Sequence, residues 1–183
     1  MEYWSDLYQE LATKIQTKRG KAIKWIDLWH EQINYLTEEL PFPVPAIFLA
    51  FNAVECNDKG KSGQECNTQV DVYLFFETFS DTYHGSYNQE GAIAFLKELT
   101  EIHKILHGTS GTNYSEMRRT GMNREESGEA GNLYRLSFEC VVDDTSAGIH
   151  YDEQTKPAAE VNMNRETPAV PPVDPSPFYH LDE

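Results

Sequence analysis

Residues 70–79, VDVYLFFETF, constrain the fold more than any other segment of the chain. Their alternation of side chains is typical of a β-strand. One side of this strand carries Val70, Val72, Leu74 and Phe76, and the other carries Asp71, Tyr73, Phe75, Glu77 and Phe79. An ordinary antiparallel strand turns one polar side toward water. This strand has large apolar groups on both sides, so both faces of its sheet need cover.

Hydrophobic periodicity and turn residues predict two helices and four to five strands. The helices are expected at residues 2–18 and 89–107, and the strands at 22–29, 46–54, 69–79, 114–121 and 133–143. A polar loop at 56–67 and a Glu- and Gly-rich tip at 124–131 complete two hairpins, and a helical turn is possible at 31–40. We therefore expect an α+β domain over residues 1–144, with an antiparallel sheet flanked by the two helices.

Each predicted helix has an apolar stripe and a glycine just beyond its end. The first stripe consists of Trp4, Leu7, Tyr8, Leu11 and Ile15, before Gly20. The second consists of Ile93, Leu96, Leu99, Ile102, His103 and Leu106, before Gly108. Spacings of three and four residues place each set on one side of its helix, and glycine is a common helix stop.

The composition changes in residues 145–183. Six of the nine prolines follow Tyr151, and hydrophobic periodicity is lost. Such a segment cannot bury enough surface to fold alone, so a disordered tail is one interpretation. Phe178 and Tyr179 nevertheless cluster beyond a proline-rich run. The other interpretation is therefore an extended arm that docks on a neighbouring subunit, because aromatic anchors on a stiff segment lose little entropy on binding.

The charge balance argues against a nucleic-acid reader. Thirty acidic and fifteen basic residues give a formal charge of −15, which repels phosphate at long range. The basic stretches at 14–24 and 117–124 are short and are interpreted as solvated charge. The sequence contains no run of 18 apolar residues, so no membrane span is expected. The acidic N-terminal residues lack the pattern of a secretory signal.

Three cysteines occur, without CxxC spacing. Cys56 and Cys66 flank the polar loop and could meet across the hairpin. Free thiols in a reducing cytosol are the favoured interpretation. Cys140 lies in the middle of a predicted strand on the inward side, where a cysteine usually acts as a small apolar residue.

The sequence contains no pattern that points to catalysis, a cofactor or a metal. His103 and His107 have the spacing of two metal ligands on a helix, but HKILH lacks the glutamate of HExxH and no third ligand is evident. Residues 81–84, DTYH, fit a turn without any acid–base role. No phosphate-binding, dinucleotide-binding or nucleophile-elbow motif is present. An enzyme is the least favoured class.

Four segments carry a resemblance to a known family. They are IKWIDLWHEQINYLTEELPFPVPAIFLAF, VDVYLFFETF, AIAFLKELTEIHKILHG and LYRLSFECVVDD. With the order of elements, they resemble the tail terminator proteins, also called tail-completion or minor tail proteins, of long-tailed phages and prophages. The resemblance covers residues 3–144 and leaves the proline-rich arm unexplained.

The resemblance implies a structural virion protein of the phage tail or neck, assembled in the cytoplasm of the bacterial host. Such proteins form a homo-oligomeric ring, commonly a hexamer, at the head-proximal end of the tail tube. The ring stops tail polymerisation and joins the tail-tube protein to the head-tail connector, while DNA passes through without specific binding. The family has no catalytic residues to carry over. The alternatives are a head-tail connector or neck protein, and a cytoplasmic non-enzymatic binding module.

A ring gives one answer to what covers the second side of residues 70–79. If the two helices cover the Val72 side, a second copy of the chain is expected to cover the other side. The predicted subunit interface then includes Tyr73, Phe75 and Phe79, together with Phe178 and Tyr179 of the arm. The competing expectation is that the first helix folds across that side.

Overall fold

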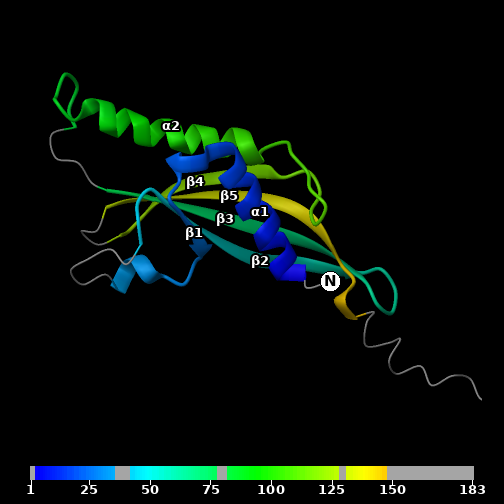
Figure 1. The fold of residues 1–183 in the computed structure, drawn as a ribbon. Helices are drawn as coiled ribbons and strands as arrows, with labels where there is room; N and C mark the ends of the chain where they lie inside the picture. The colour runs from blue at the N-terminus through cyan, green and yellow to red at the C-terminus, as the bar shows by residue number, and fades with distance from the viewer. Residues whose placement is uncertain (1–2, 36–41, 78–81, 128–130, 148–183) are drawn as a thin grey trace, which may run out of the picture.

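The computed structural model describes residues 3–35, 42–77, 82–127 and 131–147 (Figure 1). Two α-helices, two short 3-10 helices and five strands follow one another along the chain. The elements are α1 (Tyr3–Arg19), η1 (Gly20–Ala22), β1 (Trp25–Leu28), η2 (Gln32–Tyr35), β2 (Ala46–Asp58), β3 (Gln64–Phe76), α2 (Gln89–Leu106), β4 (Arg118–Glu125) and β5 (Asn132–Asp144). The predicted arm at residues 145–183 lies almost wholly outside the described residues.

The five strands form one sheet in the order β1-β2-β3-β5-β4, which confirms the α+β class. The sheet is mixed, because β1 pairs with β2 in parallel and the other pairs are antiparallel. A fully antiparallel sheet was expected. Parallel neighbours need a connection of about a dozen residues or more. The segment between β1 and β2 contains η2 and is long enough to bring the chain back to the same end of the sheet.

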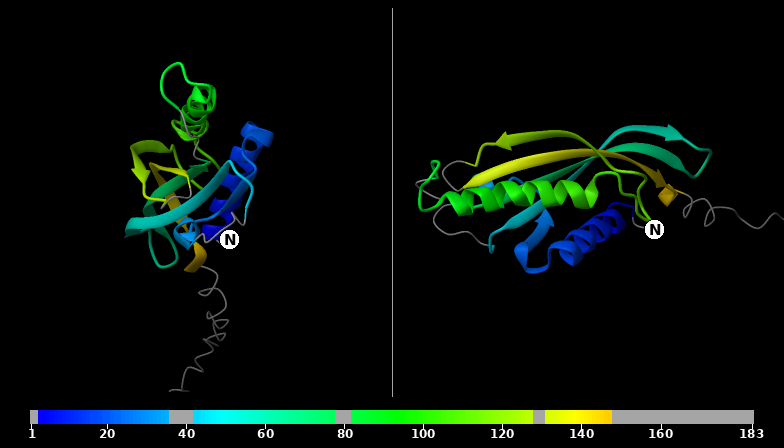
Figure 2. Two further views of the ribbon diagram at one scale, coloured as in Figure 1. Left: turned by 90° about the vertical axis from the view of Figure 1, so that its left-hand side faces the viewer. Right: turned by 90° about the horizontal axis from the view of Figure 1, so that it is seen from above.

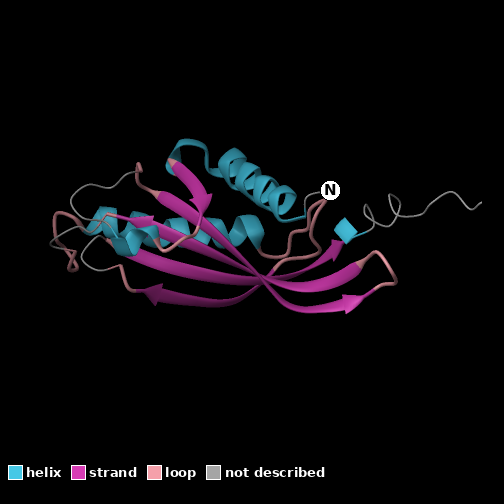
Figure 3. Cartoon of the chain, turned by 90° about the horizontal axis from the view of Figure 1, so that it is seen from below, coloured by secondary structure: helices cyan, strands magenta, loops and turns pink. Residues whose placement is uncertain are grey.

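Both helices pack on one face of the sheet (Figures 2 and 3). Leu7, Leu11 and Ile15 of α1 are fully buried against it. From α2 the buried residues are Phe95, Leu99, Ile102 and Leu106. The strands contribute Ile47, Leu49, Val70, Val72, Leu74, Phe76, Leu136, Phe138, Cys140 and Val142. The expectation that the helices cover the Val72 side of residues 70–79 is confirmed.

The N-terminal helix is fixed to the loop that follows α2 by partly buried and exposed polar contacts. Lys14 Nζ donates to the Thr109 hydroxyl and to the Tyr114 hydroxyl, at 2.7 Å each. The Glu10 carboxylate accepts from the backbone N–H of Thr112 at 2.7 Å. Gly111 sits against Glu10, and a Cβ there would lie 2.0 Å from its carboxylate oxygen. A larger residue at position 111 would therefore displace the contact between α1 and the loop.

The hairpin of β2 and β3 is longer than the sequence pattern indicates. The predicted polar loop at 56–67 is wrong, because the strands continue to Asp58 and resume at Gln64. The side chains from Asn52 to Asp58 are exposed, so polar residues continue the strand without any apolar alternation to reveal it. The distal part of the hairpin runs past both helices (Figures 1 and 2).

A disulfide joins Cys56 and Cys66, with Cα atoms 4.1 Å apart. The two residues are direct partners in the register of β2 and β3. The expectation of free thiols is therefore wrong for this pair, and the hairpin geometry is the reason. Once both strands extend beyond the predicted loop, the two side chains lie opposite each other at the short distance of a cross-strand pair.

Helix α2 begins and ends close to the predicted positions, and Gly108 stops it with a φ of +70°. Its buried stripe differs from the prediction, and His103 is only partly buried. Ile93 and Leu96 are 40% and 55% exposed, and Phe95 is buried instead. The Phe95 ring packs on Phe76 and Tyr134, at centroid distances of 4.7 and 5.2 Å. This aromatic contact sets the rotation of the helix and turns Leu96 outward.

Candidate interaction surfaces

The second face of the sheet is covered at one end by the chain itself. Phe75 is fully buried, with Phe42, Phe48 and Leu133 in a second apolar cluster. Ile33 of η2 completes its cover. The expectation that the subunit leaves Phe75 open is wrong, and so is the alternative that α1 covers it. The segment between β1 and β2 folds across this face, since its apolar side chains have no other core to join.

Tyr73 is partly covered and stacks on Trp29. The two rings are 4.1 Å apart at their centroids and 8° from parallel. Burial, and then the nearby Asp71 carboxylate, raise the pKa of the Tyr73 hydroxyl above its ordinary value. Tyr73 keeps some exposed surface, so its place in a subunit interface stays a prediction. Phe79, Phe178 and Tyr179 lie outside the described residues.

Beyond Tyr73 the second face becomes polar. Asp71 is only 3% exposed, and its carboxylate accepts from the Ser137 hydroxyl at 2.6 Å and from Gln69 Nε2 at 2.9 Å. Arg135 lies 4.0 Å from the same carboxylate and forms a closer ion pair with Glu125, at 2.8 Å. These contacts satisfy the charge that burial would otherwise penalise. The arrangement is that of a structural network around a buried carboxylate.

Besides the terminal strand β1, which pairs with β2 only, two strand edges lack a partner on one side in the described part of the chain. Strand β4 pairs with β5 only, and its residues are mostly exposed. Strand β2 pairs with β1 over Ala46–Leu49, so its continuation through Asp58 has β3 on one side alone. Open edges offer unpaired N–H and C=O groups to another chain. The two edges differ in charge, because β4 carries Arg118, Arg119 and Arg124.

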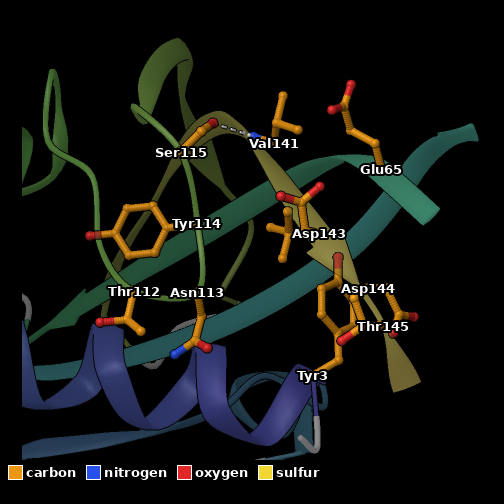
Figure 4. Close-up of a pocket in the computed structure, with 11 residues that line it drawn as sticks. Tyr3, Glu65, Thr112, Asn113, Tyr114, Ser115, Val141, Asp143, Asp144 and Thr145 are labelled. Carbon is orange, nitrogen blue, oxygen red and sulfur yellow. Dashed lines mark hydrogen bonds between the residues drawn. The ribbon is translucent and has the colours of Figure 1, made fainter. Parts of the chain in front are cut away.

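A cleft of about 370 Å³ lies between the start of α1, the loop before β4 and the end of β5 (Figure 4). Its wall includes Tyr3, Asn113 and the carboxylates of Glu65, Asp143 and Asp144. Lys59 Nζ lies 2.7 Å from Asp143 and also pairs with Glu65. The described residues that line the cleft include neither histidine nor cysteine.

His103 and His107 lie close together without a ligand set around them. Their ring centroids are 4.7 Å apart, and His107 Nδ1 accepts from the backbone N–H of Arg119 at 3.0 Å. Burial, and then the positive charge of Arg119, lower the pKa of His103. In the described ranges, no group of three or more His, Cys, Asp or Glu side chains is placed to hold a metal ion.

Cys140 occupies the position that the strand pattern predicts. The residue is 5% exposed and packs in the cluster beneath the helices. Burial raises the pKa of its thiol to about 11, so the reactive thiolate form is disfavoured at neutral pH. The side chain is a small apolar part of the core.

Sequence reasoning missed the residues that cover the second face. Trp29, Ile33, Phe42 and Val44 come from a segment with three prolines and little periodicity. The available signal was the density of apolar residues in this segment, which is unusual for a solvent-exposed connection.

In the described residues, no helix has the length and apolar character needed to cross a membrane. No protein-family model matches the chain, and a search of curated proteins finds no significant match.

Proposed function

We propose that the protein is a structural virion component of the tail-terminator kind. In this role it forms a ring at the head-proximal end of a phage tail tube, ends tail polymerisation and joins the tail to the head-side connector. It assembles in the cytoplasm of the bacterial host. The observation that carries the proposal is the presence of two unlike open sheet edges, on β4 and on the distal part of β2.

Unlike edges suit a ring. A head-to-tail contact joins one surface of a subunit to a different surface of the next, and it closes when the rotation between subunits divides a full turn. Strand β4 offers arginines, and the distal part of β2 offers the exposed carboxylates of Glu55 and Asp58. These charges favour β4 of one copy facing β2 of the next over either edge facing itself.

The net charge of −15 is compatible with a channel for DNA. A wall with an acidic surplus repels phosphates, so DNA can slide past without being held. The tail-tube protein and the connector are the partners that the family resemblance implies. A head-tail connector would share the ring and the channel, and the two roles differ in which neighbour the ring contacts.

The first experiment measures self-association of the full chain. Light scattering after size exclusion, over about a hundredfold range of concentration, follows assembly by mass action. We expect a discrete oligomer that appears as a closed ring in negative-stain electron microscopy. A strict monomer throughout this range, also in the presence of tail-tube protein, would contradict the proposal.

A matched pair of variants tests whether the open edge of distal β2 contributes to self-association. Val54 is 66% exposed at the bulge of distal β2, and Tyr87 is 98% exposed just before α2. We expect Val54→Lys to reduce the oligomer fraction, because it places a positive charge on the acidic edge, opposite the arginines of β4 in the next copy. Tyr87→Lys introduces the same charge away from that edge and should leave assembly intact. Equal effects of the two variants would argue against an edge contact.

A further inference from the structure

The outward side of α2 carries apolar groups that the sheet does not cover. Ile93 and Leu96 are 40% and 55% exposed and lie three residues apart, on the same side of the helix. Met122 of β4 is 50% exposed. We refer to Ile93, Leu96, Met122, Arg119 and Arg124 as the α2–β4 face.

The strand register places the β4 residues on the helix side of the sheet. Met122 is opposite Leu136 and Arg124 is opposite Tyr134. Both partners belong to the cluster beneath the helices, and directly opposed residues of an antiparallel pair share a face. Met122 and Arg124 therefore project beside α2.

Arg119 marks the other end of the same face. It is opposite Phe138, which is fully buried beneath the helices, and its backbone N–H donates to His107 at the end of α2. Strand β4 thus runs along α2, with one arginine on each side of Met122. The face combines an apolar centre with two cationic ends.

We propose that residues 176–183 of this chain, SPFYHLDE, dock on the α2–β4 face. Phe178, Tyr179 and Leu181 supply apolar anchors for its centre. Residues 166–183 contain Glu166, Asp174, Asp182 and Glu183 but neither lysine nor arginine. This acidic segment would be repelled by most of a chain with a net charge of −15, and the arginines of the α2–β4 face attract it.

The length and composition of the arm allow this contact. Residues 148–175 span up to about 90 Å when fully extended, at roughly 3.3 Å per residue. The α2–β4 face of the same copy or of an adjacent copy is within that reach. The prolines at 168, 171, 172 and 175 restrict the backbone before the anchors, which lowers the entropy lost on docking.

The inference does not require a ring. It concerns which surface receives the arm, and a monomer that binds its own arm satisfies it. A failure of the arm to reach the α2–β4 face leaves the edge contact of the proposed ring untouched, because that contact is tested through Val54.

A photo-crosslinking experiment on the full chain tests the contact. Phe178 is replaced by benzoylphenylalanine, the protein is irradiated, and crosslinked peptides are mapped by mass spectrometry. We expect crosslinks to residues 93–100 and 119–124. Mixing isotopically labelled and unlabelled protein distinguishes the same copy from a neighbour, and either source supports docking on this face. Crosslinks confined to other surfaces, or their absence, would overturn the inference.

Substitutions in the α2–β4 face provide a second test of the docking contact. Leu96→Asp and Arg124→Glu should each lower the crosslink yield by about tenfold, the loss that a 1.4 kcal/mol weakening produces. Tyr83→Asp and Lys61→Glu make the matching changes on exposed residues elsewhere and should leave the yield unchanged. Circular dichroism confirms that each variant is folded, and Arg124→Glu alone suffices if Leu96→Asp does not fold. An unchanged yield in the folded α2–β4 variants would also overturn the inference.

Discussion

Phe75 shows how one side chain determines the organisation of the second sheet face. It is fully buried although it projects away from both helices, and it contacts rings from the connection between β1 and β2. The Phe42 ring meets it edge-on, at a centroid distance of 6.0 Å. Phe75, on the side of VDVYLFFETF that seemed to need a second subunit, therefore belongs to a second core within the subunit.

We expect Phe75→Ala to destabilise the folded chain by about 3–5 kcal/mol, the usual loss for a buried phenylalanine. Urea denaturation followed by circular dichroism measures the change. Tyr87→Ala is the control, because Tyr87 is 98% exposed and should change stability by less than about 0.5 kcal/mol. A folded Phe75→Ala protein with unchanged stability and reduced self-association would instead restore the interface interpretation.

His103 gives stability a dependence on pH. Its pKa is lower in the folded chain than its ordinary value of 6.5, because burial and the positive charge of Arg119 disfavour the protonated ring. The unfolded chain therefore binds more protons, and the free energy of unfolding falls as the pH drops below about 6.5.

Replacing this histidine should remove part of the acid sensitivity. We expect His103→Gln to show a smaller loss of stability than the parent between about pH 7.5 and pH 5.5, the range around the ordinary histidine pKa. Urea midpoints at both pH values provide the measurement. The parallel variant His84→Gln alters an exposed histidine and should behave like the parent. Identical pH profiles for His103→Gln and the parent would contradict this account.

At the scale of elements, hydrophobic periodicity predicted the helices and strands whose apolar residues face a core. The two helices and β5 lie close to their expected positions, because their apolar residues follow the 3.6- or two-residue period. Strand β1 is only half as long as the strand expected at residues 22–29, and its burial does not alternate.

The distal end of β2 escaped prediction, since its exposed residues have no core to impose alternation. The distal end of β3 does alternate, but its buried positions are Cys66 and Thr68, which do not stand out as an apolar stripe in the sequence. The rotation of α2 was also missed. Adjacent Phe95 and Leu96 both fit a stripe, and only packing against Phe76 decides between them.

The interaction surfaces were less predictable than the fold. Tyr73 and Phe75 were correctly identified as a side of β3 that needs cover, yet sequence alone did not show where the cover comes from. Pairing partners are fixed by tertiary contacts, so the open edges of β2 and β4 emerge only from the completed sheet. The parallel placement of β1 is likewise a property of the connection and not of the strand itself.

The disulfide of the β2–β3 hairpin predicts a specific thiol count and stability change. In denaturant without reductant one thiol, that of Cys140, should react, and after reduction all three should react. Closing a loop with a sequence separation of 10 stabilises a chain by about 2–3 kcal/mol on the loop-entropy account.

The double variant Cys56→Ser/Cys66→Ser provides the comparison. It should unfold at lower urea concentration than the oxidised parent, and dithiothreitol should lower the midpoint of the parent but not that of the variant. Three reactive thiols in the unreduced, freshly purified protein would show that the hairpin is not crosslinked.

At the scale of the whole molecule, the net negative charge of the chain destabilises the compact folded state. Of the fifteen surplus negative charges of the chain, ten lie in residues 1–144, where they repel one another within one small domain. The described arginines and lysines offset this locally, as in the half-buried pair of Arg19 and Glu98 that links the two helices. The remaining repulsion acts over the surface and is screened by salt.

Raising the NaCl concentration should therefore stabilise the fold. Between about 10 and 200 mM the Debye length falls from roughly 30 Å to below 10 Å, so repulsion across the domain is largely removed. We expect the melting temperature to rise by about 2–4 °C, the shift that about 1 kcal/mol produces in a chain of this size. Thermal scans in NaCl and in KCl separate screening from specific ion binding. A fall in melting temperature would show that attractive ion pairs outweigh the net repulsion.

The pairing of Cys56 with Cys66 also has a geometric consequence for the whole of β3. Side chains on a strand alternate between faces, so a slip of one residue against β2 would exchange every inward group for its neighbour. Phe75 would then face the helices, and Leu74 and Phe76 would move to the second core. A bond between two directly opposed residues is compatible with one alignment only. The disulfide at the distal end of the hairpin thus assigns each residue of VDVYLFF to its face.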